Sequence, residues 1–543
     1  MLLQKRPDGR TAMHASTETN SAGPGPSGLG DHRLRAAFAG LLTAMFIGAL
    51  DQTIMATALP TIAGQLGGLT ELSWVVTAYV LAAAASTPLW GKASDLLGRK
   101  RLIAGALVAF VGFSMLSGTA STIGWLVAFR ALQGIGAGGV MTLATASVAD
   151  LVPPRERGRY QGYIQLTFLV ASLAGPLLGG LFVDQLSWRW AFYVNVPIGV
   201  VALSLLAAYL PAGEQRREAR LDYAGAALLA GLVVAIMLIA TWGGSQYRWG
   251  SPAILGLIAV AVALLGAFVR REQAAAEPVL PLRLFADRVF TVVSAAAFVA
   301  TLSLFAAIVF LPVFLQLVTG ASATLSGLLT LPLLGASALT TIAAGQIMTR
   351  TGRYKIFPVI GLAAMSTGLF LFSTLGATGS RLEAALFMVV FGAGFGMVTQ
   401  ILMVAIQNAV TPREIGTATA SANLFRALGG SVGVAIYGAV FAAGLRHWLP
   451  FELHGRIPRG VTAAGIQAAP DRIHALTPTI QHAIAQAVGN SLHDVFLLAA
   501  PIALAGFFIV LALREQPLRG RQQAAQPQPV KPDSVAPPKR IAA

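Results

Sequence analysis

Cysteine is absent from the 543 residues, and only 11% of them are charged. Without cysteine, this chain cannot form a disulfide, a thiol nucleophile or a thiolate metal site. A soluble domain carries about 25% charged residues, so the shortage of charge indicates a lipid environment rather than water. The apolar runs also lack an ATP-binding Gly-x-x-x-x-Gly-Lys-Ser/Thr loop and a His/Asp/Glu ligand cluster, which disfavours an ATP-driven pump and a metalloenzyme.

Apolar runs recur along nearly the whole chain, in which 55% of the residues are hydrophobic. A run of about twenty residues is long enough to cross a hydrocarbon core about 30 Å thick. We therefore predict an all-α polytopic membrane protein with about fourteen spanning helices. The predicted parts are a flexible tail over 1–35, a six-helix bundle over 36–210, two inserted spans over 222–270, a second six-helix bundle over 289–513 with a long outer loop over 446–490, and a disordered tail over 514–543.

The basic residues explain the net charge of +16 by their position between the spans. With the N-terminus in the cytoplasm, most of them lie in inner loops, and the short outer loops receive only Arg189, Arg248 and Arg381. The positive-inside rule strongly favours this orientation. We therefore expect a multi-pass protein of the plasma or inner membrane with both termini cytoplasmic, whose basic residues require no nucleic acid as a partner.

A weak internal repeat follows the second span of each six-span set. The first copy is Gly91, Asp95, Gly98, Arg99 and Lys100, and the second is Gly345, Gly352, Arg353 and Lys355, with Thr349 in the place of an acid. Repeats of this kind are common in secondary transporters, whose binding site lies between the halves near the middle of the membrane.

The first copy, which runs from Gly91 to Arg101, resembles the signature loop of the major facilitator superfamily. Its glycines permit a tight turn. Asp95 can face a helix N-terminus or an arginine and be released when the halves move, so we expect a conformational gate here. A basic loop that only sets topology is the alternative. Thr349 puts a symmetric gate in the second half in doubt.

Asp51 lies in a stretch of the first span that resembles the motif of the superfamily's drug:proton antiporters, Leu50 to Pro60. About sixteen residues, or roughly 24 Å of helix, separate it from the preceding arginines, which places it inside the membrane. A carboxylate at that depth is expensive and indicates function. We expect it to load and release a proton, although an acid that only packs helices is the alternative.

Arg130 lies in a stretch of the fourth span, Leu126 to Gly139, that resembles the family's proton-transfer motif. Its depth is similar to that of Asp51, so its fixed charge is expected to tune a proton on that carboxylate. An arginine bonded to backbone carbonyls is the alternative, and the two roles can coexist.

Four residues of the fifth span, Gly175, Pro176, Gly179 and Gly180, resemble the motif that separates exporters from symporters in this superfamily. Proline removes a helix hydrogen bond, and glycine allows close approach of a second helix. Export rather than uptake rests mainly on this match, and a generic packing seam is the alternative.

The resemblance implies two six-helix bundles with two inserted helices, and a proton gradient in place of a cofactor. Its expected substrates are small lipophilic, often cationic, drugs or toxic compounds. Weakly indicated cavity residues are Trp74, Tyr79, Gln133, Phe305, Gln316 and Arg426. For Arg426, structural pairing is an equal alternative. The histidines beside the outer loop match no metal motif, so we expect no metal site.

The leading prediction is a non-enzymatic antiporter that works by alternating access, with protons, a small molecule and the lipid bilayer as its partners. A dedicated exporter of one endogenous metabolite or siderophore remains open, and a proton-coupled importer on the same fold is disfavoured by the fifth-span motif. Channels are disfavoured because no repeated selectivity-filter segment appears.

Overall fold

The computed structural model describes residues 31–66, 72–212, 221–244, 246–376, 379–453 and 477–518. The regular elements of these residues are all helices. Fourteen of these helices are long and apolar enough to cross a membrane. The predicted all-α membrane fold is therefore confirmed.

The N-terminal bundle contains seven helical segments, of which the short α6 leads directly into α7. Its segments are α1 (Asp31–Leu66), α2 (Leu72–Leu97), α3 (Arg99–Gly118), α4 (Ile123–Leu151), α5 (Arg157–Gln185), α6 (Trp190–Tyr193) and α7 (Asn195–Tyr209). Within this bundle α1 packs against α4, α5 and α7, and α4 packs against α2 and α3.

In sequence, the helices α8 (Tyr223–Trp242) and α9 (Pro252–Ala274) lie between the two bundles. They pack against each other, and α8 also contacts α2 and α15. The C-terminal bundle then begins with a short 3-10 turn. Its segments are η1 (Leu282–Ala286), α10 (Arg288–Leu317), α11 (Ala323–Leu329), α12 (Leu331–Thr351), α13 (Ile356–Ser373), α14 (Arg381–Ala409), η2 (Pro412–Glu414), α15 (Ile415–Glu452) and α17 (Pro478–Leu511).

Polar side chains fix several helix starts. The Asp287 carboxylate accepts hydrogen bonds from the first amides of α10, and the Ser251 hydroxyl caps α9 immediately before its proline. Ser380 and Glu383 form a reciprocal capping box at the start of α14. These caps satisfy amides that have no partner within the helix, so each apolar run begins at a defined residue.

Two predicted boundaries differ from the structure. The expected outer loop 446–490 is helical at both ends, because α15 continues to Glu452 and α17 begins at Pro478. Hydropathy marks where a helix leaves the apolar layer, whereas backbone hydrogen bonding continues beyond it. Residues 514–518 of the expected disordered tail pack on the protein, where Glu515 accepts hydrogen bonds from the backbone amides of Tyr354 and Lys355. The N-terminal tail up to residue 30, the loop segment 454–476 and the tail after 518 lie outside the described residues.

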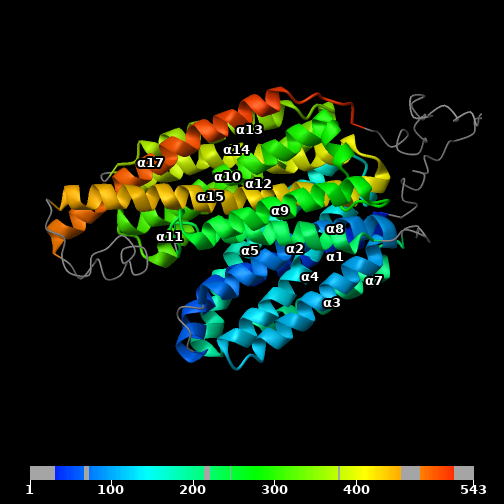
Figure 1. Ribbon diagram of the computed structural model, residues 1–543, viewed down its shortest axis with the longest axis horizontal. Helices are drawn as coiled ribbons and strands as arrows, with labels where there is room; N and C mark the ends of the chain where they lie inside the picture. The colour runs from blue at the N-terminus through cyan, green and yellow to red at the C-terminus, as the bar shows by residue number, and fades with distance from the viewer. Residues whose placement is uncertain are drawn as a thin grey trace, which may run out of the picture.

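The two bundles lie side by side, and both described chain ends lie at one end of the molecule (Figure 1). We call this end, where α1 begins and α17 ends, the termini end, and the opposite end the far end (Figure 1). Two seams join the bundles, one between α2 and α15 and the other between α5 and α12. Towards the far end, the last turns of α1 and of α15 lie well apart (Figure 1).

The internal repeat is visible in the backbone of these seams. Gly98 and Gly352, each seven residues after the first glycine of its copy, have φ angles of 90° and 71°. Such angles favour glycine. The first glycines also correspond, because Gly91 lies against α15 and Gly345 lies against α5, with no room for a Cβ atom at either position.

Candidate functional site

Asp51 and Arg130 form a buried ion pair within the N-terminal bundle. Arg130 Nη1 lies 2.6 Å from Asp51 Oδ2, and each side chain is only 1% exposed. The structure thus brings together the two residues whose similar depth suggested mutual influence. Since neither charge reaches solvent in this state, each depends on its neighbours for stabilisation.

Two amide side chains complete the surroundings of the Asp51 carboxylate. Gln133 Nε2 and Asn195 Nδ2 each donate a hydrogen bond of 2.9 Å to Asp51 Oδ1. The Gln133 oxygen accepts from Arg130 Nη1 at 2.9 Å, and Asn195 Nδ2 also lies 2.9 Å from the Ser114 hydroxyl. We call Asp51, Arg130, Gln133, Asn195 and Ser114 the charge network.

Sequence reasoning missed Asn195 and Ser114 and misplaced Gln133. Gln133 was expected in the substrate cavity, but it is 0% exposed and belongs to the charge network. A weak signal for Asn195 exists, since it is an amide within the apolar run that becomes α7. Ser114 carries no such signal, because a serine is ordinary in a membrane helix.

Tyr79 on α2 also belongs beside Arg130 rather than in a cavity. The Arg130 guanidinium carbon lies 4.1 Å from the centre of the Tyr79 ring, and the tyrosine is 1% exposed. Arg130 Nε also donates a hydrogen bond of 3.4 Å to the Val75 carbonyl of α2. The cation therefore has a carboxylate, an aromatic face and a backbone acceptor as neighbours.

The fifth-span motif packs on α1 immediately after Asp51. A Cβ atom at Gly175 would clash with Thr53, and one at Gly179 would clash with Thr57. The Thr53 hydroxyl donates a hydrogen bond of 3.1 Å to the Ala171 carbonyl of α5. By contrast, a Cβ atom at Gly180 meets open space, and Pro176 is exposed. Two of the four motif residues thus define a close seam with the helix that carries Asp51.

Asp95 joins the bundles at the α2–α15 seam. Its carboxylate accepts hydrogen bonds from the Gly416 and Thr417 amides at 2.9 and 2.8 Å, and from the Thr417 hydroxyl at 2.9 Å. These amides are the free donors at the start of α15, where the helix dipole favours a negative charge. The predicted gate residue therefore bridges two bundles in this state.

Arg99 holds the Asp95 carboxylate from the N-terminal side. Its Nη2 lies 3.3 Å from Asp95 Oδ1, its Nε lies 2.9 Å from Asp150 Oδ2, and it also donates to the Ala146 carbonyl. Sequence reasoning missed Asp150, which lies in the last turn of α4. Lys100, the last of the predicted gate residues, is partly exposed.

The α5–α12 seam uses a different contact where Thr349 replaces the acid. Arg155 Nε donates to the Thr349 carbonyl at 3.0 Å, and Nη2 donates to the Arg350 carbonyl at 3.2 Å. These carbonyls lie in the last turn of α12, which has a partial negative charge. A charged group thus joins the bundles at the second seam as well, and there it is a guanidinium from the N-terminal bundle.

The remaining cavity candidates lie apart from the charge network. Trp74 packs edge-on against Trp242 of α8, with ring centres 5.7 Å apart. Phe305 lies against the backbone of Gly430, and the Gln316 amide donates to the Ser326 hydroxyl at 3.4 Å. Trp74 of α2 thus contacts α8, Phe305 contacts α15 and Gln316 contacts α11, so these contacts do not bring the three side chains together.

Polar side chains also meet across the interface between the bundles. Gln165 of α5 donates to Ser337 of α12 at 3.4 Å and accepts from Gln400 of α14 at 3.5 Å. Asn423 of α15 donates to Thr142 of α4 at 3.4 Å. We call Thr142, Gln165, Ser337, Gln400 and Asn423 the polar layer. Its hydrogen bonds are long and therefore weak, and they connect the bundles without a charged group.

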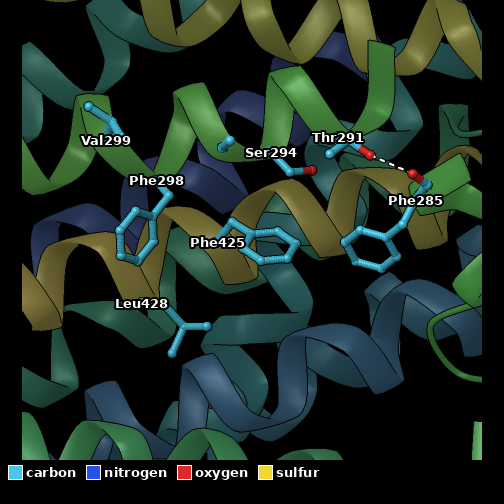
Figure 2. Close-up of a pocket in the computed structure, with 8 residues that line it drawn as sticks. Phe285, Thr291, Ser294, Phe298, Val299, Phe425 and Leu428 are labelled. Atoms are coloured by element: carbon cyan, nitrogen blue, oxygen red, sulfur yellow. Dashed lines mark hydrogen bonds between the residues drawn. The ribbon is translucent and has the colours of Figure 1, made fainter. Parts of the chain in front are cut away.

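A mostly apolar pocket of about 320 Å³ lies between η1, α10 and α15. Figure 2 shows Phe285, Phe298 and Phe425 along it, with the Thr291 hydroxyl donating to the Phe285 carbonyl at 2.7 Å. Arg426 is not among the residues that line this pocket, although its neighbours Phe425 and Leu428 are. This pocket is therefore separate from Arg426 and from the charge network.

Comparison with known proteins identifies the family to which this fold belongs. The family model described as Major Facilitator Superfamily matches residues 41–434. The chain belongs to the major facilitator superfamily. Proteins of this superfamily are transporters, and the all-helical fold with fourteen candidate spans agrees with that assignment.

Relatives in the superfamily include several named for drug transport. The chain is 38% identical to the multidrug transporter protein MdtP of Bacillus subtilis, covering 74% of each chain. It is 33% identical to multidrug resistance protein 3 of the same species, over 87% of this chain and 93% of the relative. An uncharacterised MFS-type transporter of Mycobacterium tuberculosis is 40% identical, over 89% of this chain and 69% of the relative.

Solved structures of the superfamily share the fold at low identity. The human organic anion transporter MFSD10 aligns with a TM-score of 0.59 at 16% identity, covering 88% of this chain and 99% of that one. The proton:xylose symporter XylE aligns with a TM-score of 0.58 at 16% identity, covering 91% and 98%. This likeness describes the fold, and the transport direction must be argued from this chain's own residues.

Proposed function

We propose that this transporter exports small lipophilic compounds across the plasma or inner membrane in exchange for protons. The buried Asp51–Arg130 ion pair carries the proposal, because it puts one titratable carboxylate against one permanent cation inside the membrane. Relatives named as multidrug transporters support the substrate class. The fifth-span motif supports export, since its Gly175 and Gly179 pack directly on the helix that carries Asp51.

The proposed orientation places the termini end in the cytoplasm. Basic side chains concentrate in the loops of this end, as the positive-inside rule requires of cytoplasmic loops. Both seams lie towards this end, while the bundles lie apart at the far end (Figure 1). The described state is then closed towards the cytoplasm and faces outward.

Protonation of Asp51 changes what its carboxylate can accept. In the ionised form its two oxygens accept from Arg130, Gln133 and Asn195. A neutral carboxyl group becomes a donor at one oxygen and gives up the ion pair, so at least one of these contacts must rearrange. The binding of a proton thus alters the packing of α1 against α4 and α7.

Two helices link this rearrangement to the seams. On α2, Tyr79 contacts Arg130, and Gly91 and Asp95 on the same helix form the seam with α15. On α5, Gly175 packs beside Asp51, while Gly158 at its other end lies against Gly345 of α12. α2 therefore contacts the charge network directly, and α5 contacts it through α1. Nearer the termini end, the same two helices contact the C-terminal bundle. We assign proton coupling to this mechanical connection.

Whole-cell efflux tests this function. Cells producing the native chain should accumulate less of the lipophilic dye ethidium than cells without it, and a protonophore should abolish the difference. Asp51→Asn keeps the shape of the side chain but removes the charge and its titration, so it should eliminate export. Asp184→Asn, at an exposed position of α5, is the matched control and should retain it. Equal export by the native chain and Asp51→Asn would contradict proton coupling through this residue.

A further inference from the structure

Arg426 is a second arginine within the spans, with surroundings unlike those of Arg130. It lies eleven residues after the start of α15, about 16 Å along the helix, in a segment long and apolar enough to cross the membrane. Its side chain is partly exposed. Among the residues that the structure describes, its guanidinium makes no hydrogen bond, ion pair or ring contact. Five N–H donors and a permanent charge are therefore unused.

The helix register places Arg426 beside the polar layer. Gln407 of α14 donates to the Thr419 hydroxyl of α15 at 3.0 Å, and these two helices run in opposite directions. Arg426 lies seven residues, or two turns, after Thr419 and therefore on the same face of α15. Gln400 lies seven residues before Gln407 and therefore on the same face of α14. Because the helices are antiparallel, both steps lead towards the far end. Arg426 therefore lies at the level of Gln400.

Asn423 gives a second, independent placement. It lies one turn before Arg426 on α15, so the two side chains are i, i+3 neighbours with Cβ atoms about 5–6 Å apart. The Asn423 amide reaches Thr142 of the N-terminal bundle. Arg426 therefore lies one turn on the far-end side of a contact between the bundles, where the bundles begin to separate.

We propose that Arg426 binds the carboxylate of amphipathic organic acids that the transporter exports. A guanidinium matches a carboxylate with two parallel hydrogen bonds, and amide groups at the level of Gln400 and Asn423 can donate to the same anion. An unpaired cation at membrane depth is costly, and a substrate anion removes that cost. This assignment rests on the proposed export function and adds organic anions to the cations that the family resemblance implied.

Binding to the purified, detergent-solubilised chain tests the assignment without any proton gradient. The probes are pyrenebutyrate, which carries a carboxylate, and its uncharged methyl ester. The native chain should bind the acid at least about tenfold more tightly than the ester, the least expected when a charge-assisted bidentate pair forms. Arg426→Gln should remove this preference and leave ester binding unchanged, and Arg426→Lys should restore part of it. Arg446→Gln, at an exposed position of the same helix, is the matched control and should behave as native.

Several outcomes would overturn the assignment. Equal affinity of the native chain for acid and ester would do so without any variant, even if Arg426→Gln failed to fold. A preference for the acid that survives in Arg426→Gln would place the anion elsewhere. Displacement of pyrenebutyrate by phosphatidylglycerol, but not by short organic acids, would assign the site to a lipid headgroup. Because these results need no pH gradient, they are separate from a failure of proton coupling.

Discussion

The two bundles contribute to the seams in opposite ways. The N-terminal bundle supplies the charged groups, the Asp95 carboxylate at one seam and the Arg155 guanidinium at the other. The C-terminal bundle supplies helix ends, the first amides of α15 and the last carbonyls of α12. Each charge matches the partial charge of the helix end that it meets. The two seams thus both place a charged side chain against a helix end, with the sign of the charge reversed.

The same asymmetry extends into the membrane. The acid of the charge network belongs to the N-terminal bundle and is fully paired, whereas Arg426 of the C-terminal bundle has no described partner. We infer that one bundle carries the proton and the other receives the substrate. The variants described next test the comparison between the seams, and the reactivity of one introduced cysteine measures the effect of each seam variant.

The absence of cysteine makes that reporter simple. Thr142→Cys introduces a single thiol on α4 at a position that is 1% exposed and faces Asn423 across the interface. Its rate of modification by a maleimide measures how often the termini end opens. The native background should react slowly, because both seams cover this position.

Gly345→Ala should have the largest effect. Its new methyl group would clash with the Gly158 backbone, which no side-chain rotation can relieve, so the α5–α12 seam cannot close. We expect the rate of maleimide modification of Thr142→Cys to rise by more than about a hundredfold, because strain of several kcal/mol in the closed state corresponds to a factor of that size. Gly335→Ala on the same helix meets open space and should leave the rate unchanged. A slow rate in both variants would show that the seam does not need glycine.

Asp95→Ala should open the other seam by a smaller amount. It leaves two amides of α15 without their acceptor and removes one of the two carboxylates that pair with Arg99. Hydrogen bonds to charged groups are worth about 1.5–3 kcal/mol each. Because water can replace part of this loss, we expect an increase of roughly ten- to a hundredfold in modification. Lys100→Ala, at a partly exposed neighbouring position, is the control. Equal rates for these two variants would remove Asp95 from the gate.

Arg155→Gln should have a weaker effect than Asp95→Ala. Arg155 is exposed, and its acceptors are neutral carbonyls, so solvent screens and replaces the contact. An increase of about two- to fivefold in modification is expected, from a contribution of at most about 1 kcal/mol. Arg159→Gln, which is also exposed but bonds within α5, should be neutral. An effect of Arg155→Gln larger than that of Asp95→Ala would reverse the comparison.

Asp222→Asn should change stability without changing the seams. The Nε and Nη2 groups of Arg271 donate hydrogen bonds to the Asp222 carboxylate and lower the pKa of that carboxyl. Because its folded pKa is below its unfolded value, its stabilisation is present above about pH 4 and is lost as the pH falls through the folded pKa. The variant should therefore unfold a few degrees below the native chain at pH 7, and this difference should shrink below pH 4 in thermal scans. A difference that grows on acidification would contradict the assignment, and the Thr142→Cys rate should not change.

Much of the fold followed from the sequence because charge is rare in lipid. Fourteen apolar runs predicted fourteen spans, and a carboxylate and a guanidinium at similar depth predicted the pair that the structure brings into contact. What failed was the direction of polar side chains. Tyr79 and Gln133 were expected in a cavity and are buried beside Arg130, because a helix that is apolar all round gives no amphipathic stripe from which to read a face.

The contacts at the seams were beyond sequence reasoning for a second reason. Arg155 appeared only as one of many basic loop residues, and nothing in a single sequence says that it reaches the last carbonyls of α12. Asn195 and Ser114 are neutral, so Asn195 gives only a weak signal within its apolar run and Ser114 gives none. Only the packing of the helices brings such residues together, so the sequence does not reveal them. Asp51 can be recognised from the sequence because placing a carboxylate within the membrane costs free energy.

Proton movement in proteoliposomes tests the central claim most directly. The native chain or Asp51→Asn is reconstituted with a pH-sensitive dye in the lumen, and ethidium or pyrenebutyrate is added on one side. Substrate-driven proton movement in the native chain, absent from Asp51→Asn while probe binding persists, is the predicted result. If instead both forms move the probe without proton movement, Asp51 is not the coupling carboxylate and the proposed exchange is wrong.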